Sequence, residues 1–88
     1  MFYYTYVLRS TEGKKLYIGW TDDLKSRASK HNRGLVLATK DRRPLKLIHY
    51  EYFVDKHDAE AREKFLKSGF GRNQLKLALN KTLQDFSI

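Results

Sequence analysis

Two runs of strand-forming residues stand close together at the start of the chain, and they limit the folds that it can adopt. Residues 2–10 (FYYTYVLRS) and 15–20 (KLYIGW) are dense in Tyr, Val, Leu and Ile, which favour β-strands. The intervening TEG supplies a turn, in which Gly13 can take the positive φ that most residues avoid. We therefore expect a β-hairpin on which the rest of the chain packs.

Tyrosine side chains are the unusual feature of this hairpin. A buried phenol needs a hydrogen-bond partner, so a strand that only filled a core would use Phe or Ile at lower cost. Because side chains alternate along a strand, Tyr4, Tyr6 and Leu8 share one face of the first strand, and Tyr17 shares a face of the second strand with Gly19. Either these tyrosines are ordinary strand residues or their hydroxyls have a function.

The chain after the hairpin predicts one helix and a third strand. Thr21 is expected to cap the helix, with Asp22 and Asp23 in its first turn, where carboxylates favour the positive helix end. This helix should run to about residue 32 or 33 and stop at Gly34. After a connecting loop that ends at Pro44, residues 45–53 are expected to form the third strand.

Two further helices are predicted in the C-terminal part. Asp55 can cap a helix that ends near Ser68, with Gly69 beyond its end. Gly71 is expected to open the last helix, whose apolar stripe consists of Leu75, Leu79 and Leu83. The expected order of elements is ββαβαα.

Length and cysteine content restrict the class of protein. A chain of 88 residues is expected to form one domain, residues 1–88, that buries roughly 60 to 65% of its unfolded surface. Cysteine is absent, which excludes disulfides, a thiolate nucleophile and a cysteine zinc site. Arg9 interrupts the apolar N-terminus before a signal peptide or membrane span could form. We expect a cytoplasmic protein.

Positive charge dominates the composition and is concentrated in one stretch. The chain has 18 Lys and Arg against 10 Asp and Glu, a formal net charge of +8. Nucleic acid is the expected partner, because Lys and Arg replace counterions on phosphates; a basic surface that serves only solubility is the alternative. No basic helix has a continuous apolar face, which argues against a membrane surface. The stretch contains Lys25, Arg27, Lys30, Arg33, Lys40, Arg42 and Arg43.

Several polar residues fall on helix faces that should be buried. Arg27 and His31 lie on the same stripe as Leu24 in the first predicted helix. A structural explanation is that Arg27 extends its charge to the rim and His31 makes a satisfied hydrogen bond. In the second predicted helix Glu63 stands at the edge of the apolar arc, and Arg62 lies nearer to its middle.

Glu63 also has a purely structural explanation. It stands four residues before Lys67, and an ion pair at this spacing contributes only a few tenths of a kcal/mol.

Taken together, these residues resemble a known family. TYV at residues 5–7, YIG at 17–19, Arg27, His31, and Glu63 within AREKFLK are similar to the motifs of the GIY-YIG nuclease domain. The stretches YVLRS, LYIGWTDDLKSRASKHN, RRPLKLIHYE and AREKFLKSGFGR resemble in particular its short, single-domain bacterial members. The resemblance extends to about residue 76.

Three positions depart from the family pattern. Thr5 stands where the first motif usually has Ile, and Tyr4 stands where it has Gly. Many members also carry a supporting asparagine in the C-terminal part, for which Asn73 and Asn80 are the available candidates.

The resemblance implies a fold and a chemistry. The fold would be a small α/β (α+β) domain, a three-stranded antiparallel sheet flanked by helices. The activity would be metal-dependent hydrolysis of a phosphodiester in DNA, with one Mg²⁺ or Mn²⁺ bound by Glu63. The strand tyrosines Tyr6 and Tyr17 would line the site with Arg27, and His31 could orient Tyr17 or move a proton.

Individual roles follow from chemistry applied to this resemblance. Tyr17 is the candidate base, although an ordinary phenol with a pKa near 10 needs nearby cations to act at neutral pH. Arg27 can hold a phosphate oxygen and stabilise the charge of the transition state. Gly19 would allow the close approach of a backbone or phosphate, or would only bend the end of a strand.

Three functions stay open at the level of sequence. The chain could be a nuclease acting on structured or damaged DNA in repair or recombination, a nucleic-acid-binding module without turnover, or a protein-interaction domain. The larger relatives bind their substrates through additional domains. The resemblance here covers only the nuclease module, so we expect this chain to bind its substrate through its own basic surface or through a protein partner. That surface would consist of Lys25, Lys30, Arg33, Lys40, Arg42 and Arg43. The oligomeric state is open.

Overall fold

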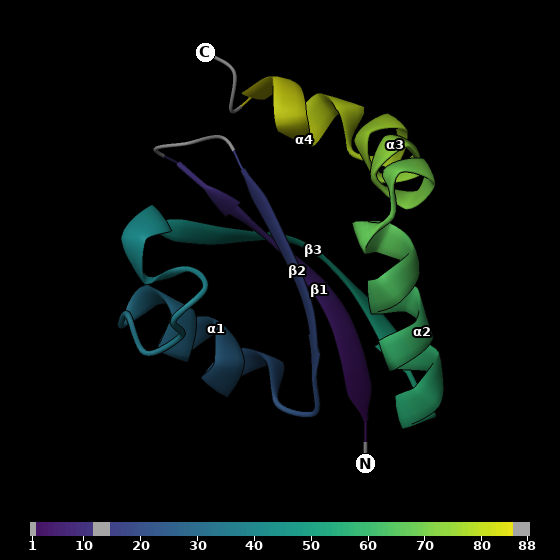
Figure 1. The fold of residues 1–88 in the computed structure, drawn as a ribbon, viewed down its shortest axis with the longest axis horizontal. Coiled ribbons are helices and arrows are strands. Elements are labelled where there is room, and N and C mark those ends of the chain that lie inside the picture. Colours follow the sequence, from purple (N-terminus) through teal and green to yellow (C-terminus); the bar gives the residue numbers. More distant parts are fainter. Residues whose placement is uncertain (1, 12–14, 86–88) are drawn as a thin grey trace.

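A three-stranded antiparallel sheet forms the centre of the molecule, with helices on both of its faces (Figure 1). The computed structural model describes residues 2–11 and 15–85; the predicted turn at Gly13 lies outside them. Strand order is β2-β1-β3, and the expected α+β fold is confirmed. The strands are β1 (Tyr3–Ser10), β2 (Leu16–Thr21) and β3 (Leu45–Phe53), and the α-helices are α1 (Leu24–Asn32), α2 (Lys56–Lys67), α3 (Gly69–Ala78) and α4 (Asn80–Asp85).

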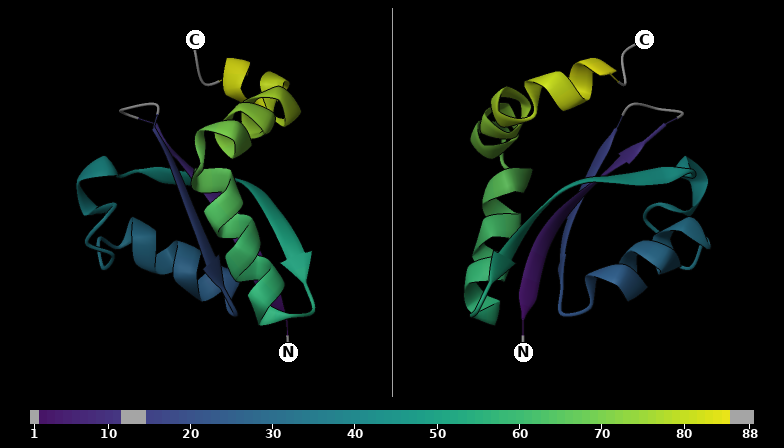
Figure 2. Two further views of the ribbon diagram at one scale, coloured as in Figure 1. Left: turned by 45° about the vertical axis from the view of Figure 1, so that its right-hand side comes forward. Right: turned by 180° about the vertical axis from the view of Figure 1, so that it is seen from behind.

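The two faces of the sheet carry different cores. Strand β1 is the central strand, and its alternating side chains point to opposite faces. Val7 packs with Ile18 of β2 and with Leu66 and Leu75 of α2 and α3. Tyr6 and Leu8 instead pack with Tyr17 and with Leu24 of α1. Figure 2 shows α1 on one side of the sheet and α2 on the other.

The start of α1 differs from the prediction. Thr21 remains the last residue of β2, and its hydroxyl oxygen accepts a hydrogen bond from the Asp23 N–H at 3.1 Å. Asp23 is the cap, because its carboxylate accepts from the Ser26 N–H at 3.1 Å. Strand pairing of Thr21 with Tyr4 therefore moves the helix start beyond both aspartates. The predicted stop is confirmed by Gly34, which has φ +75°.

The C-terminal helices also refine the prediction. Asp55 caps α2 as expected, but α3 begins at Gly69, earlier than predicted, because Ser68 caps it by accepting from the Gly71 N–H at 3.1 Å. Gly71 is needed at this corner, since a Cβ there would overlap the Phe65 carbonyl. The single predicted last helix is divided at Leu79 into α3 and α4.

The connecting loop before β3 contains one turn of 3-10 helix, η1 (Lys40–Arg42). None of the helices in residues 2–11 and 15–85 has the length and apolar composition that a membrane span requires.

Candidate functional site

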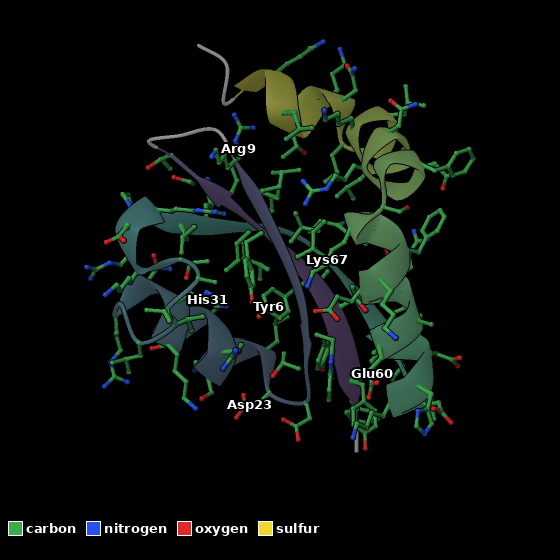
Figure 3. All side chains as sticks on the ribbon, viewed as in Figure 1. Tyr6, Arg9, Asp23, His31, Glu60 and Lys67 are labelled. Atoms are coloured by element: carbon green, nitrogen blue, oxygen red, sulfur yellow. The ribbon has the colours of Figure 1, made fainter. Side chains whose placement is uncertain are left out.

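Four of the predicted site residues meet on the α1 face of the sheet. Tyr6 comes from β1, Tyr17 from β2, and Arg27 and His31 from α1. The Tyr6 hydroxyl lies 3.0 Å from His31 Nε2, and the Tyr17 ring lies 4.8 Å from the His31 ring between centroids. Figure 3 shows Tyr6 and His31 between α1 and the strands. We call these four residues the tyrosine cluster.

His31 is held between two hydroxyl groups. Its Nε2 faces the Tyr6 hydroxyl, and its Nδ1 lies 2.7 Å from Thr39 Oγ1. The side chain has 0% exposure, and burial, assisted by the positive charge of Arg27, lowers the pKa of His31 to about 4. At neutral pH the imidazole is therefore uncharged. Of the two tyrosines, Tyr6 is hydrogen-bonded to His31, whereas Tyr17 contacts His31 through the rings.

Tyr6 is buried and stays protonated at neutral pH. Its exposure is 1%, and burial raises its pKa to about 12, although the hydrogen bond and the charge of Arg27 act in the opposite direction. A phenol in this state donates or relays a hydrogen bond and does not act as a base. Tyr17 is less buried, which makes it the tyrosine of the cluster that solvent can reach.

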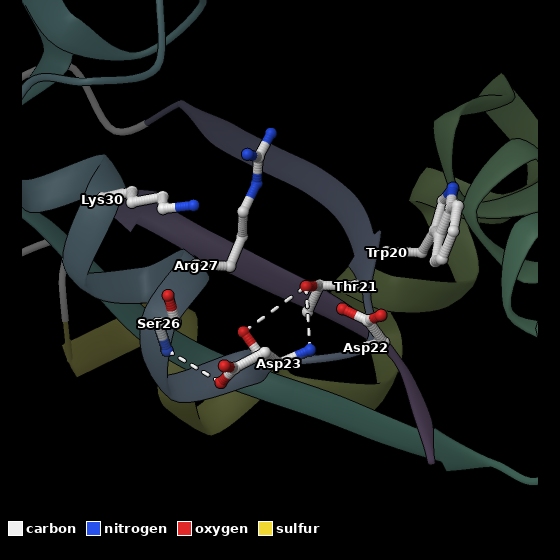
Figure 4. A pocket seen from close by; sticks show the side chains of 7 residues that line it. All are labelled: Trp20, Thr21, Asp22, Asp23, Ser26, Arg27 and Lys30. Atoms are coloured by element: carbon white, nitrogen blue, oxygen red, sulfur yellow. Dashed lines mark hydrogen bonds between the residues drawn. The ribbon is translucent and has the colours of Figure 1, made fainter. Parts of the chain in front are cut away.

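Arg27 connects the tyrosine cluster to an open hollow. Hydrogen bonding to Tyr6, and to a smaller extent to Tyr17, raises the pKa of the guanidinium, which stays cationic. The hollow has a volume of about 410 Å³ and is lined by Trp20, Thr21, Asp22, Asp23, Ser26, Arg27 and Lys30. In Figure 4, Arg27 and Lys30 stand on one side and Trp20 on the other. We call it the α1 hollow.

Gly19 provides space for Tyr6. The two residues are paired across β1 and β2, and a Cβ at Gly19 would lie 2.7 Å from the Tyr6 hydroxyl oxygen. The group that closely approaches this glycine is therefore the phenol of Tyr6.

Glu63 stands apart from the tyrosine cluster. It belongs to α2, on the other face of the sheet, and its carboxylate forms the i, i+4 ion pair with Lys67 at 3.3 Å that the structural explanation predicts. Its negative charge still contributes to raising the pKa of Tyr6. Glu63 therefore acts on the cluster through space and not through direct contact.

The arrangement of the acidic residues shows which of them could bind a metal ion. Within residues 2–11 and 15–85, no group of three or more His, Cys, Asp or Glu residues is arranged to bind one. The Glu63 side chain is 20% exposed, against 48% for Lys67, so its carboxylate is partly sheltered and still accessible. A single carboxylate fits a hard cation that keeps most of its waters.

Arg62 has a structural partner. Its guanidinium donates to both carboxylate oxygens of Glu51 at 2.9 and 3.3 Å, and His49 Nε2 lies 3.0 Å from the same carboxylate. Burial acts to raise the pKa of Glu51, but these hydrogen bonds outweigh burial and the net pKa is lowered. Arg62 therefore binds α2 to β3 and lies outside the tyrosine cluster.

The basic residues expected to form one surface are spread over several places. Lys30 lines the α1 hollow. Lys25 lines a neighbouring hollow beside Tyr4 and Tyr50, and Arg42 lines a third one near α3. The remaining ones are Arg33, the exposed C-cap residue of α1, Lys40 in η1, and Arg43, whose Nε donates to the Lys40 carbonyl at 2.8 Å.

The positions that depart from the family pattern have structural partners. Thr5 is buried, and its hydroxyl donates to the Ala59 carbonyl of α2 at 2.8 Å. The Tyr4 ring contacts the rings of Tyr50 and Tyr52 edge-on. Of the asparagine candidates, Asn73 is exposed on α3, and Asn80 is exposed and accepts from Gln84 Nε2 at 3.0 Å.

Thr39 is the member of the site that sequence reasoning did not identify. It is fully buried under His31, yet it belongs to a stretch read only as a connecting loop. No local pattern marks it, because its partner is contributed by another element.

Comparison with known proteins identifies the family of this chain. The chain matches the GIY-YIG catalytic domain over residues 2–76. It is 34% identical over 83 residues to a UPF0213 protein of Clostridium perfringens, covering 93% of this chain and 88% of that protein. A UPF0213 protein of Pediococcus acidilactici is 37% identical over 81 residues, covering 89% and 82%. One of Lacticaseibacillus paracasei is 44% identical over 62 residues, covering 69% and 68%.

No solved structure gives a significant match. The family domain covers every strand of the sheet and all four residues of the tyrosine cluster, and the names of the relatives add no specific substrate. The chain therefore belongs to the GIY-YIG nuclease superfamily, together with its short bacterial UPF0213 members.

Proposed function

We propose that this protein is a divalent-metal-dependent endonuclease that hydrolyses phosphodiester bonds in DNA in the cytoplasm. Structured or damaged DNA, as it occurs in repair and recombination, is the proposed substrate. The family implies a nucleic acid substrate and a nuclease activity, and the net charge of +8 suits a polyanion. A partner protein could add targeting.

The position of Arg27 supports this proposal most strongly. A permanently charged guanidinium stands beside two tyrosine hydroxyls and at the edge of an open hollow that Lys30 also lines. A phosphate placed there would meet a donor fork that suits its geometry. Negative charge that grows on the phosphate in the transition state would be stabilised by the same group.

The two tyrosines receive different roles in this proposal. Tyr17 is the more accessible one. With the Arg27 cation nearby, its hydroxyl would first lose its own proton to solvent, and the resulting phenolate would take the proton of the attacking water. Tyr6, protonated and hydrogen-bonded to neutral His31, would act as a positioning residue. His31 and Thr39 would fix the hydroxyl of Tyr6 below the reacting groups.

Glu63 is the proposed ligand of one Mg²⁺ or Mn²⁺. When bound, such an ion would neutralise charge on the leaving oxygen. Binding requires the Glu63 carboxylate to leave its ion pair with Lys67, which is an exposed i, i+4 pair of small energy.

A cleavage panel tests the proposal. The purified protein is incubated with Mg²⁺ or Mn²⁺ and with linear, flapped and branched DNA, and with RNA. Glu63→Gln and Tyr17→Phe are compared with Tyr50→Phe, a control tyrosine that is 54% exposed on β3. We expect metal-dependent DNA products that both site variants lose by at least about 100-fold and that the control retains.

Each other outcome selects a different function. Salt-dependent binding without products at any metal concentration would overturn the nuclease and favour a binding module. Absence of salt-dependent binding would leave an interaction domain. Cleavage of RNA alone would contradict the DNA assignment while retaining the chemistry.

A further inference from the structure

The third hollow, near α3, lies away from the tyrosine cluster, and four of its five described lining residues are cationic. It has a volume of about 380 Å³, and we call it the α3 hollow. Among residues 2–11 and 15–85 no acidic residue lines it, which separates it from the α1 hollow with its two aspartates. Its lining residues are Lys15, Leu16, Arg42, Arg72 and Lys76.

Three separate segments of the chain place these four cations together. Arg72 and Lys76 stand one turn apart on α3, so their side chains lie on the same side of the helix. Arg42 belongs to η1, whose end is attached to β1 because the Ser10 hydroxyl donates to the Arg42 carbonyl at 2.6 Å. Lys15 immediately precedes β2.

A further positive charge lies near this hollow, and few negative charges neutralise its cations. Arg9, buried at 4% exposure, is paired across the strands with Leu16, which lines the hollow. None of the ion pairs in the described part of the chain includes Arg42, Arg72 or Lys76. Arg72 donates its Nε to the Lys67 carbonyl at 3.2 Å, which fixes the side chain without neutralising it. Like charges held in one hollow favour an anionic ligand.

Strand β2 connects this hollow to the proposed cleavage site. Its first residue, Leu16, lines the α3 hollow, and its last ones, Trp20 and Thr21, line the α1 hollow. A strand of six residues spans about 17 Å at a rise of about 3.3 Å per residue. Successive base pairs of a duplex advance by about 3.4 Å along its axis, so the two hollows lie roughly five base pairs apart along a duplex whose axis runs parallel to β2.

We infer that the α3 hollow binds the phosphate backbone of a DNA duplex about five base pairs from the phosphate at the α1 hollow. The claim that one duplex occupies both hollows at this spacing rests on the proposed function. Binding of duplex phosphates by the α3 hollow itself does not require that the protein cleaves DNA.

A salt titration of binding tests the hollow without turnover. A 20-bp DNA duplex is titrated with wild-type protein and with Arg72→Gln/Lys76→Gln, without divalent ions, between 50 and 200 mM salt. Each lost phosphate contact reduces the slope of log K against log salt by about 0.9. We expect the slope of the double variant to be smaller than that of wild type by about 1.8. Between 50 and 200 mM salt, the decrease in affinity should therefore be about tenfold smaller for the variant than for wild type.

The control variant removes the same charge elsewhere. Lys64→Gln/Lys81→Gln changes two exposed lysines that line none of the three hollows described, and we expect it to keep most of the wild-type slope. An equal loss of slope in both variants would show a diffuse charge effect and overturn the inference. An unchanged slope in the α3 variant would also overturn it, provided that thermal unfolding shows it to be folded.

A length series tests the spacing. With duplexes of 4 to 12 bp, wild-type affinity should increase most strongly once the duplex exceeds about five base pairs, and the α3 variant should lack this step. A step that persists in the α3 variant would contradict the placement. If the cleavage panel shows no products but the step is present and lost in the variant, the nuclease fails and the DNA-binding hollow stands.

Discussion

The two faces of the sheet have cores of different chemistry. On the α2 and α3 face, Val7 and Leu66 pack in an apolar cluster. On the α1 face, the same strands place buried Tyr6 and partly buried Tyr17 against His31. An apolar core on both faces would avoid the cost of burying polar groups, which need partners to be tolerated.

The difference separates a face held together by apolar packing from a face organised around buried polar groups. The apolar face is stabilised mainly by burial, which does not depend on orientation, with Arg62 and Thr5 adding hydrogen bonds between α2 and the sheet. The α1 face depends on hydrogen-bond geometry, with distances of 3.0 and 2.7 Å on the two sides of His31. Substitutions on the two faces should therefore affect different measurements.

The largest effect is expected from Arg27→Lys. A lysine keeps the charge but cannot reach both tyrosine hydroxyls and a phosphate with a rigid fork. The rate of cleavage, measured by single-turnover kinetics, should fall by about 100- to 1,000-fold. The melting temperature should not change. The matched control is Arg62→Lys, whose guanidinium binds Glu51. Equal losses of activity in both variants would remove the distinction between the faces.

Leu66→Ala should have the opposite effect. Leu66 is 1% exposed in the apolar cluster, so its truncation should cost about 2 to 5 kcal/mol of unfolding free energy, measured by denaturant titration. Activity per folded molecule should be retained. Leu77→Ala, at a residue that is 72% exposed, serves as the control and should change stability little.

Stability should depend on pH through His31. Its pKa in the folded state, about 4, lies below the ordinary value of 6.5, so the unfolded chain binds the proton more readily. The stabilisation is present above pH 6.5 and is lost as the pH falls towards 4; it amounts to at most about 3 kcal/mol. His31→Gln should flatten this part of the profile in chemical denaturation, whereas His57→Gln at an exposed site should not.

Gly19→Ala tests how tightly the α1 face is arranged. The new methyl group would press on the Tyr6 hydroxyl and disturb its hydrogen bond to His31. We expect a loss of about 1 to 3 kcal/mol and a weaker Tyr6–His31 contact, visible in the imidazole NMR signals. Gly69→Ala has open space around its Cβ and should be tolerated. Wild-type signals in Gly19→Ala would contradict the tight packing.

The smallest effect on stability is expected from Lys67→Gln. The exposed pair with Glu63 contributes less than about 1 kcal/mol, so the melting temperature should change little. Because Glu63 loses its competing cation, the metal concentration for half-maximal cleavage should fall a few-fold. Lys56→Gln, which removes the similar pair with Glu60, should leave the metal dependence unchanged.

Local sequence rules were sufficient for most of the fold. Strand β3 has the predicted bounds, Asp55 caps α2, and Gly34 stops α1. These features depend on backbone hydrogen bonds and dihedral preferences within a few residues. The predicted cap at Thr21 was wrong because pairing with Tyr4 across β1 and β2 keeps Thr21 in the strand, and such pairing lies beyond local rules.

The sequence by itself determined the family, the hairpin and the side of its own strand or helix on which each of Tyr6, Tyr17, Arg27 and His31 stands, because strand alternation and helix periodicity fix side-chain direction. The packing of α1 on the sheet decided that these sides meet. Only the tertiary structure decided that Thr39 holds His31, that Tyr6 occupies the space above Gly19, and that Arg42 joins Arg72 and Lys76 in one hollow. Those contacts join residues that are distant in the chain. Their geometry is set by how the sheet and helices pack, which no local pattern encodes.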